Sequence, residues 1–193
     1  MTAARTQQAF TLVELMVTVS IVGILAGLSI VTFAGNWRDE RVKAATRESS
    51  AWLDEVRRVA IQNAKPCRIK LNRTDAAFSL DPNPENDQEF CAANLYATLN
   101  IRTTVQNSGD IVLCSADLLS TEDPTTKSLS CSGAQSGSSS LIFTPRGTTT
   151  SGLLIKVHMP QARTDRCIAV LAPLGQIRSG RATASGCDFT TAY

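Results

Sequence analysis

The hydrophobic and polar positions divide the chain into three parts. Residues 10–34 read FTLVELMVTVSIVGILAGLSIVTFA, an almost wholly apolar run in which Glu14 is the one charged side chain. A helix of about 20 apolar residues crosses the hydrocarbon core of a bilayer. The run therefore predicts a transmembrane helix. The nine residues before it are polar, and Arg5 is the only charged side chain among them.

In residues 35–65 the apolar positions recur at helical spacing, so this segment predicts an amphipathic continuation of the same helix. The predicted buried positions are Val42, Ala45, Trp52, Leu53, Val56, Val59, Ala60 and Asn63. The opposite face is rich in Arg, Lys, Asp and Glu, which we expect to face solvent. Pro66 ends the helix, because proline disfavours the helical conformation at the residue before it.

Residues 66–193 change to strand patterns. Cys67–Leu71 alternates, and Ala76–Leu80 is predicted to return as its hairpin partner across residues 72–75. Residues 81–110 and 121–140 are rich in turn-forming residues and predict loops. Further strands are predicted at 111–114, 141–143, 153–157, 167–171 and 176–178. The turn residues between them suit an antiparallel sheet, so the expected class is α+β.

Glu14 is the informative residue of the apolar run. A carboxylate at the centre of a membrane helix costs about 2.5–3.5 kcal/mol, less near the ends, unless a partner compensates for it. A cut between Ala9 and Phe10 creates an ammonium group four residues before Glu14, on the same helix or on a neighbouring copy. A secretory signal peptide has a shorter apolar core with a cut after it. A plain single-span anchor leaves Glu14 unexplained.

The string from Ala9 to Glu14 resembles the leader junction of type IV pilins and type II secretion pseudopilins. The resemblance implies a class III leader, residues 1–9, that a prepilin peptidase removes before Phe10. It also implies N-methylation of Phe10 and a role for Glu14 in docking into a helical filament of other pilins or pseudopilins. Ala9 stands where this family usually has Gly, and we expect cutting to survive. The run also lacks the mid-membrane proline of many major pilins.

A second resemblance lies in the C-terminal half. The pieces Phe143-x-Pro145-x-Gly147 and Gly175-Gln176-Ile177-Arg178 resemble the GspH/FimT domain of minor pilins and pseudopilins. The resemblance implies a pilin-like fold, in which the long helix packs on a β domain of residues 66–193. It also implies a single-pass protein of the inner membrane with this domain in the periplasm.

The sequence has six cysteines: Cys67, Cys91, Cys114, Cys131, Cys167 and Cys187. An even number without C-x-x-C spacing, after an export segment, favours disulfides over a metal site. Six cysteines allow 15 pairings, and pairing of sequence neighbours is the simplest. Each such bridge closes a loop of about 20 residues, which stabilises a fold by about 3 kcal/mol in the loop-entropy model.

The C-terminal end is basic. Residues 1–145 carry 13 Lys and Arg against 15 Asp and Glu, whereas residues 146–193 carry six against two. Some FimT-like minor pilins hold DNA through a C-terminal Gly-Arg-x-Arg motif, of which Gly180-Arg181 keeps the first half. Arg178 and Arg181 on a glycine-rich turn are thus candidate phosphate contacts. DNA uptake is the alternative function, and a solvated basic edge is the plain interpretation.

Motifs of catalysis are missing from the sequence. His158 is the only histidine, and no G-x-S-x-G, Walker A or dinucleotide fingerprint is present. Asp81, Glu85, Asp87 and Glu89 are close in sequence but lack the spacing and glycine of an EF-hand. We therefore expect a structural subunit, not an enzyme, with no cofactor and no metal.

Overall fold

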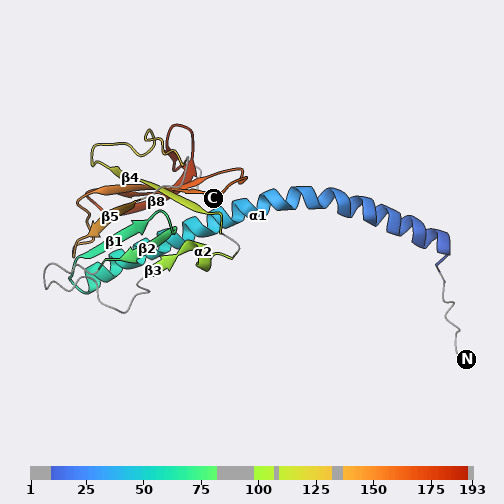
Figure 1. The fold of residues 1–193 in the computed structure, drawn as a ribbon, viewed down its shortest axis with the longest axis horizontal. Coiled ribbons are helices and arrows are strands. Elements are labelled where there is room, and N and C mark those ends of the chain that lie inside the picture. The colour runs from blue at the N-terminus through green and yellow to red at the C-terminus, as the bar shows by residue number, and fades with distance from the viewer. Residues whose placement is uncertain (1–9, 82–97, 107–108, 132–136, 191–193) are drawn as a thin grey trace, which may run out of the picture. The chain divides into compact units, whose positions relative to one another are not determined.

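The computed structural model describes residues 10–81, 98–106, 109–131 and 137–190, and all their side chains except those of residues 28–35. The chain divides into two compact units, Met1–Trp37 and Arg38–Tyr193. The first contains the beginning of the long helix. The second contains the rest of that helix and all the strands (Figure 1).

Helix α1 spans Leu12–Gln62, so the predicted apolar and amphipathic segments form one continuous helix. Its end has a specific geometry. Lys65 N–H donates to the Ala60 carbonyl and Ala64 N–H to that of Ile61, while Ala64 has a φ of 51°. This is a Schellman arrangement with alanine in the left-handed position that glycine usually fills. Among the residues whose side chains the structure describes, no helix is both long enough and apolar enough to cross a membrane.

One face of α1 is buried in the second unit, close to the prediction. Asn63 was expected on this face and is exposed, because the helix ends one residue earlier. Two polar residues, Thr46 and Ser49, are buried there instead. Their hydroxyl groups donate to the carbonyls four residues earlier, at 2.7 and 2.8 Å, which satisfies them inside the core. The buried apolar positions are Val42, Ala45, Trp52, Leu53, Val56 and Ala60.

A four-stranded antiparallel sheet has the order β3-β2-β1-β5. The strands are β1 (Cys67–Asn72), β2 (Ala77–Leu80), β3 (Thr98–Asn100) and β5 (Ser138–Phe143). The predicted hairpin of β1 and β2 is confirmed, with Asn72 opposite Ala77. Residues 81–110 were expected to be mostly loop, and two short elements, β3 and helix α2 (Ile101–Thr104), lie within this range. Both are too short to show a hydrophobic period.

A second antiparallel sheet has the order β4-β6-β7-β8-β9. Its strands are β4 (Val112–Leu118), β6 (Gly152–His158), β7 (Arg166–Leu171), β8 (Gln176–Ala182) and β9 (Cys187–Asp188). The α+β class is thus confirmed, but the strands form two sheets where one was expected. The division arises because β5 pairs with β1, with Phe143 opposite Cys67, while β6 pairs with β4 and β7.

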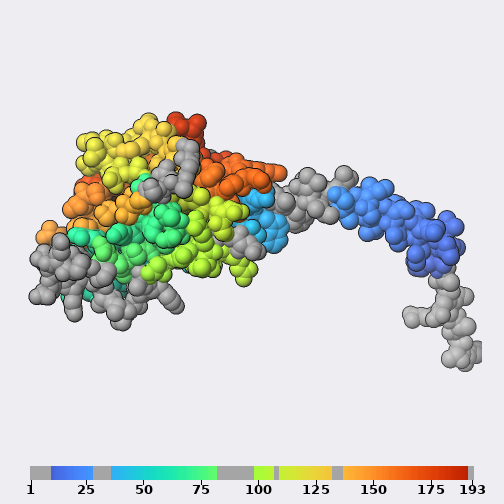
Figure 2. All heavy atoms as spheres, in the orientation of Figure 1, coloured from blue at the N-terminus to red at the C-terminus, as the bar shows by residue number. Residues whose placement is uncertain are grey.

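The main core joins α1 to both sheets. Trp52 of α1 lies against Phe78 of β2, with ring centroids 5.7 Å apart. A smaller cluster lies on the other face of the five-stranded sheet, where Leu129 packs against a group that includes Leu154 and Ala169. The segment that contains Leu129 covers this cluster; this covering segment is drawn in yellow and lies at the molecular surface in Figure 2. Strands β6 and β7 are therefore covered on both faces, which explains their nearly continuous apolar sequences.

Candidate functional site

The helix begins immediately after the predicted cleavage junction. Leu15 N–H donates to the Thr11 carbonyl at 3.2 Å, and Glu14 N–H donates to Thr11 Oγ1 at 3.3 Å. Thr11 is thus the N-cap of α1, and the pattern Thr-x-x-Glu is that of a capping box. Phe10 lies directly outside the helix and is 79% exposed, whereas Ala9 lies outside the described residues.

Glu14 therefore lies in the first helical turn, where the positive end of the helix dipole stabilises a carboxylate. This position gives Glu14 a local structural role that the sequence reasoning missed, although the capping-box spacing was visible. The local role and an ion pair with a Phe10 amine are compatible, because both favour the ionised acid at the same helix end.

Apolar side chains cover the described first part of α1 on all sides. Leu12, Met16 and Ile24 are between 64% and 74% exposed. One stripe forms a shallow groove of about 280 Å³, lined by Val13, Met16, Val17, Ser20, Ile21 and Ile24. Thr18 and Ser20 donate their hydroxyl groups to helix carbonyls, at 2.9 and 2.8 Å. The helix thus satisfies these two hydroxyl groups itself and offers an apolar surface to a partner.

Gly23 and Gly27 lie four residues apart on this helix. An added Cβ at either position would meet no atom within 4 Å. Neither glycine is required by contacts within the described chain. The absence of side chains at these positions lets another helix approach closely.

The two C-terminal turns that resemble a GspH/FimT domain meet in the second unit. Gly147 and Gly175 have φ values of 73° and 63°, and an added Cβ at Gly175 would lie 2.4 Å from the Gly147 carbonyl oxygen. Arg57 of α1 donates to the carbonyls of Gly147 and Leu174, at 2.8 and 3.1 Å. We expected Arg57 on a solvated charged face. It is half-buried and joins the helix to both turns.

Arg178 and Arg181, the candidate DNA contacts, both lie in β8 and not on a glycine-rich turn. Residues three apart on a strand face opposite sides of the sheet. Arg178 pairs with Ala169 and lies 5.0 Å from the centroid of the Phe189 ring. Arg181 pairs with Arg166, whose side chain is buried. The structure therefore does not bring the two candidates together as one phosphate clamp.

His158 takes part in an ion-pair cluster at the end of β6. Its Nδ1 lies 2.8 Å from Asp165 Oδ1, and Lys156 Nζ lies 3.0 Å from Asp165 Oδ2. Asp165 also accepts a hydrogen bond from Ala182 N–H through its backbone carbonyl, at 3.0 Å. Asp165 thus joins β6 through its carboxylate and β8 through its backbone carbonyl, which is a structural role.

No group of three His, Cys, Asp or Glu side chains suited to a metal is found in the part of the chain that the structure describes. Of the acidic loop considered above, Glu85, Asp87 and Glu89 lie outside the described residues.

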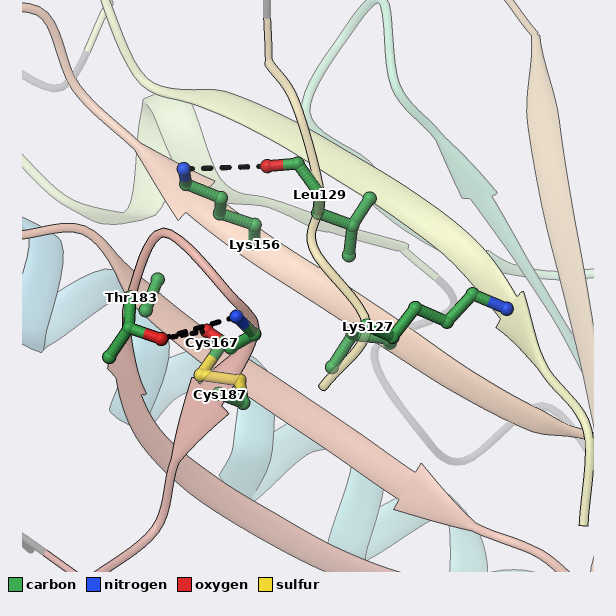
Figure 3. Close-up of a pocket in the computed structure, with 9 residues that line it drawn as sticks. Lys127, Leu129, Lys156, Cys167, Thr183 and Cys187 are labelled. Carbon is green, nitrogen blue, oxygen red and sulfur yellow. Dashed lines mark hydrogen bonds between the residues drawn. A yellow bond between two sulfur atoms is a disulfide. The ribbon is translucent and has the colours of Figure 1, made fainter. Parts of the chain in front are cut away.

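Two of the three disulfides expected from neighbour pairing are present, Cys114–Cys131 and Cys167–Cys187. Cys67 is also disulfide-bonded, and its expected partner Cys91 lies outside the described residues. Figure 3 shows the Cys167–Cys187 bond at the outer face of the five-stranded sheet. There Lys156 Nζ donates to the Leu129 carbonyl at 3.5 Å. These bonds hold the covering segment and β9 on the sheet.

Comparison with known proteins adds one specific finding and one likeness. Residues 4–30 match the family model of the prokaryotic N-terminal methylation motif. No curated protein matches the chain. The structure is similar to a crystal structure of the type IV minor pilin FimU of Pseudomonas aeruginosa (strain PAO1). The two are 14% identical, the match covers 78% of this chain and 94% of that one, and the TM-score is 0.46.

FimU in a second crystal form is similar at 13% identity, over 76% of this chain and 96% of that one, with a TM-score of 0.43. The methylation motif spans the predicted leader junction and the first turns of α1. Residues 4–30 thus carry a prokaryotic N-terminal methylation motif, in agreement with the resemblance of the string from Ala9 to Glu14.

Proposed function

We propose that this chain is a structural minor pilin or pseudopilin that enters a type IV pilus or a type II secretion pseudopilus. The observation that carries the proposal is the methylation motif at residues 4–30, which leads directly into a helix with apolar side chains on its surface. Such a helix needs a partner that covers its apolar surface, because exposed apolar area is unfavourable in water. A filament of similar helices provides that cover.

The proposed mechanism is assembly. Prepilin peptidase cuts between Ala9 and Phe10 and methylates the new amine, which remains positively charged. Glu14 faces this amine on the same helix or on a neighbouring one, and the ion pair lowers the cost of placing the carboxylate among apolar side chains. Gly23 and Gly27 allow neighbouring helices to pack closely.

Before assembly, the 10–34 segment anchors the subunit in the inner membrane and leaves the second unit in the periplasm. The support for this location is the apolar sequence of the segment together with the disulfides of the second unit, which persist in oxidising compartments. The second unit serves as a packing module of the filament. DNA uptake through Arg178 and Arg181 gains no support from β8, since the two side chains lie on opposite faces.

N-terminal sequencing and mass measurement of the protein from its native cell test the proposal. We expect a mature chain that begins at N-methylated Phe10. A bulky, charged residue at the junction, as in Ala9→Asp, should block the cut, while Ala9→Gly should keep it. A mature chain that begins at Met1 would contradict the proposal.

A further inference from the structure

The chain contains two tryptophans, Trp37 and Trp52, and their surroundings differ. Trp52 is 8% exposed and packs against Phe78 in the core. Trp37 is 60% exposed and does not belong to the core that the described residues form. An indole ring is large and mostly apolar, so leaving this much of it in water is unfavourable. The Trp37 ring therefore favours a less polar environment than the described residues provide.

The position of Trp37 in the sequence matches the surface of a bilayer. No charged residue lies between Glu14 and Arg38, so Trp37 is the last residue of an uncharged run of 23. Four charged residues follow it directly, Arg38 to Arg41. Tryptophan is enriched at such boundaries, because its ring lies at the level of the headgroups and its N–H group finds an acceptor there. Sequence position and exposure thus favour the same environment.

The length of the helix agrees with this environment. Helix α1 is continuous from Leu12 to Gln62. The 25 residues from Leu12 to Trp37 advance about 38 Å along it, at about 1.5 Å a residue. This distance exceeds the hydrocarbon core of a bilayer, about 30 Å, and stays within the thickness of about 40–45 Å that includes the headgroups. Leu12 and Trp37 can therefore lie at the two opposite surfaces of one bilayer.

The packing of the second unit on α1 begins after Trp37. Asp39 accepts a hydrogen bond from Arg163 N–H at 2.7 Å, and Val42 is completely buried. Val42 is also the first buried residue of α1 among those whose side chains the structure describes. Packing within the second unit therefore does not account for a tryptophan at position 37.

We propose that, before assembly, Trp37 lies in the headgroup layer on the periplasmic side of the inner membrane and fixes the depth of α1 in the bilayer. The inference rests on the proposed function, in which the 10–34 segment anchors the subunit. It adds the residue that sets the depth and the part of the lipid that this residue contacts. The indole N–H donates to ester or phosphate oxygens of the lipid, while the ring packs against the upper acyl chains.

This depth has a consequence for Glu14. The 23 residues from Glu14 to Trp37 advance about 35 Å, which is also more than the thickness of the hydrocarbon core. Holding Trp37 at one surface therefore keeps Glu14 near the headgroups of the other surface. The carboxylate then avoids the middle of the bilayer, where its cost is greatest. We expect the acid to lose this solvation only when the subunit leaves the bilayer for the filament.

The test is quenching of tryptophan fluorescence in the full-length chain, reconstituted in phosphatidylcholine vesicles at a low ratio of protein to lipid. The quenchers are a nitroxide on the headgroup, bromine at the middle of the acyl chain, and acrylamide in the water. The wild type is compared with Trp37→Phe, so the difference in emission reports Trp37 alone and Trp52 stays in place. We expect the headgroup nitroxide to remove the largest share of the Trp37 emission, with smaller losses to mid-chain bromine and to acrylamide.

A matched control moves the ring along the same helix. Trp37→Phe combined with Ala51→Trp places a tryptophan about 21 Å farther along α1, at a position that is exposed in the second unit. The ring at position 51 should lose emission to acrylamide and not to either lipid quencher. Equal headgroup quenching at the two positions would mean that the chain lies on the vesicle surface, and the inference would be wrong.

Flotation of the vesicles separates failure of the inference from failure of the proposed function. If the chain floats with the lipid but Trp37 loses most emission to acrylamide or to mid-chain bromine, the inference is wrong and the proposed anchoring stands. If protection of Trp37 from acrylamide disappears on dilution into more lipid, another copy covers the ring and the inference is again wrong. If the chain does not float, the inference and the proposed anchoring both fail.

Discussion

Arg57 Nε donates to the carbonyl oxygen of Gly147 at 2.8 Å, across 90 residues of sequence. The same guanidinium donates from Nη2 to the Leu174 carbonyl at 3.1 Å. One helical side chain therefore fixes two turns, which contact each other through Gly147 and Gly175. The connection from β5 to β6 and the connection from β7 to β8 therefore both depend on this point of the helix.

Arg57→Ala should lower the free energy of unfolding by about 1–3 kcal/mol, since two carbonyls lose a charged donor. Arg58→Ala is the matched control. Its side chain is 62% exposed and forms a helical ion pair with Glu55 at 3.4 Å, so its loss should cost less than about 0.5 kcal/mol. Thermal unfolding of the two purified variants, followed by circular dichroism, measures the difference. Equal losses of unfolding free energy in the two variants would mean that the hydrogen bonds from Arg57 to the turns do not stabilise the fold.

Gly175→Ala should also destabilise the fold, by more than about 1 kcal/mol. The residue has φ of 63°, and the added Cβ would lie 2.4 Å from the Gly147 carbonyl oxygen. Gly109→Ala is a suitable control, because an added Cβ there meets no atom within 4 Å. Denaturant midpoints should fall for Gly175→Ala alone. An unchanged midpoint for that variant would show that the two turns do not approach so closely.

Ala64→Gly should stabilise the protein, by about 0.5–1 kcal/mol. Ala64 holds the left-handed position that ends α1, where a Cβ is unfavourable and glycine is not. The same change at Ala60, inside the helix and in the core, should destabilise, since it removes a buried side chain and a good helix former. The sign of the shift in melting temperature distinguishes the two, and a lower value for Ala64→Gly would refute the Schellman geometry.

Glu14 variants can separate the capping role from the proposed ion pair. Glutamine preserves the capping-box pattern with Thr11 but carries no charge. Glu14→Gln and Glu14→Ala should therefore both reduce incorporation into filaments, whereas Thr11→Ala should reduce it little. The measurement is the amount of each variant in sheared filaments relative to whole cells. Full incorporation of Glu14→Gln would assign Glu14 to capping alone.

Stability should fall in acid partly through Glu122. The hydrogen bond from Lys127 and that from the Leu119 N–H hold the pKa of Glu122 below its usual value of 4.5 in the folded state. The unfolded chain therefore takes up the proton first as the pH falls. The stabilisation by ionised Glu122 is complete above about pH 4.5. It is lost as the pH drops through the pKa of Glu122 in the folded state.

Glu122→Gln removes this titrating group, so its melting temperature should depend less on pH between about 5 and 3 than that of the wild type. Glu55→Gln is the control, a half-exposed acid of α1 with an ion pair to Arg58. Identical pH profiles for Glu122→Gln and the wild type would show that Glu122 does not contribute to the loss of stability in acid.

The sequence was sufficient for features that depend on local pattern. The long helix, its end before Pro66, and the β1–β2 hairpin follow from period, proline chemistry and turn residues, and the structure agrees. The methylation motif is likewise a contiguous string, so it could be identified without a fold. The short elements β3, α2 and β9 were missed, because two to four residues carry no measurable period.

Only the tertiary structure decided how distant residues meet. The place of Glu14 in the first helical turn, capped by Thr11, depends on where the helix starts. The division into two sheets depends on whether β5 pairs with β1 or β6. From the sequence, Arg57 was predicted to be a solvated charge, whereas the fold places the turns at Gly147 and Gly175 beside it. Arg178 and Arg181 were predicted to contact phosphate together, whereas the strand register places them on opposite faces. Pattern fixes which groups are apolar or charged along the chain, whereas pairing and packing between distant segments set which of them are neighbours.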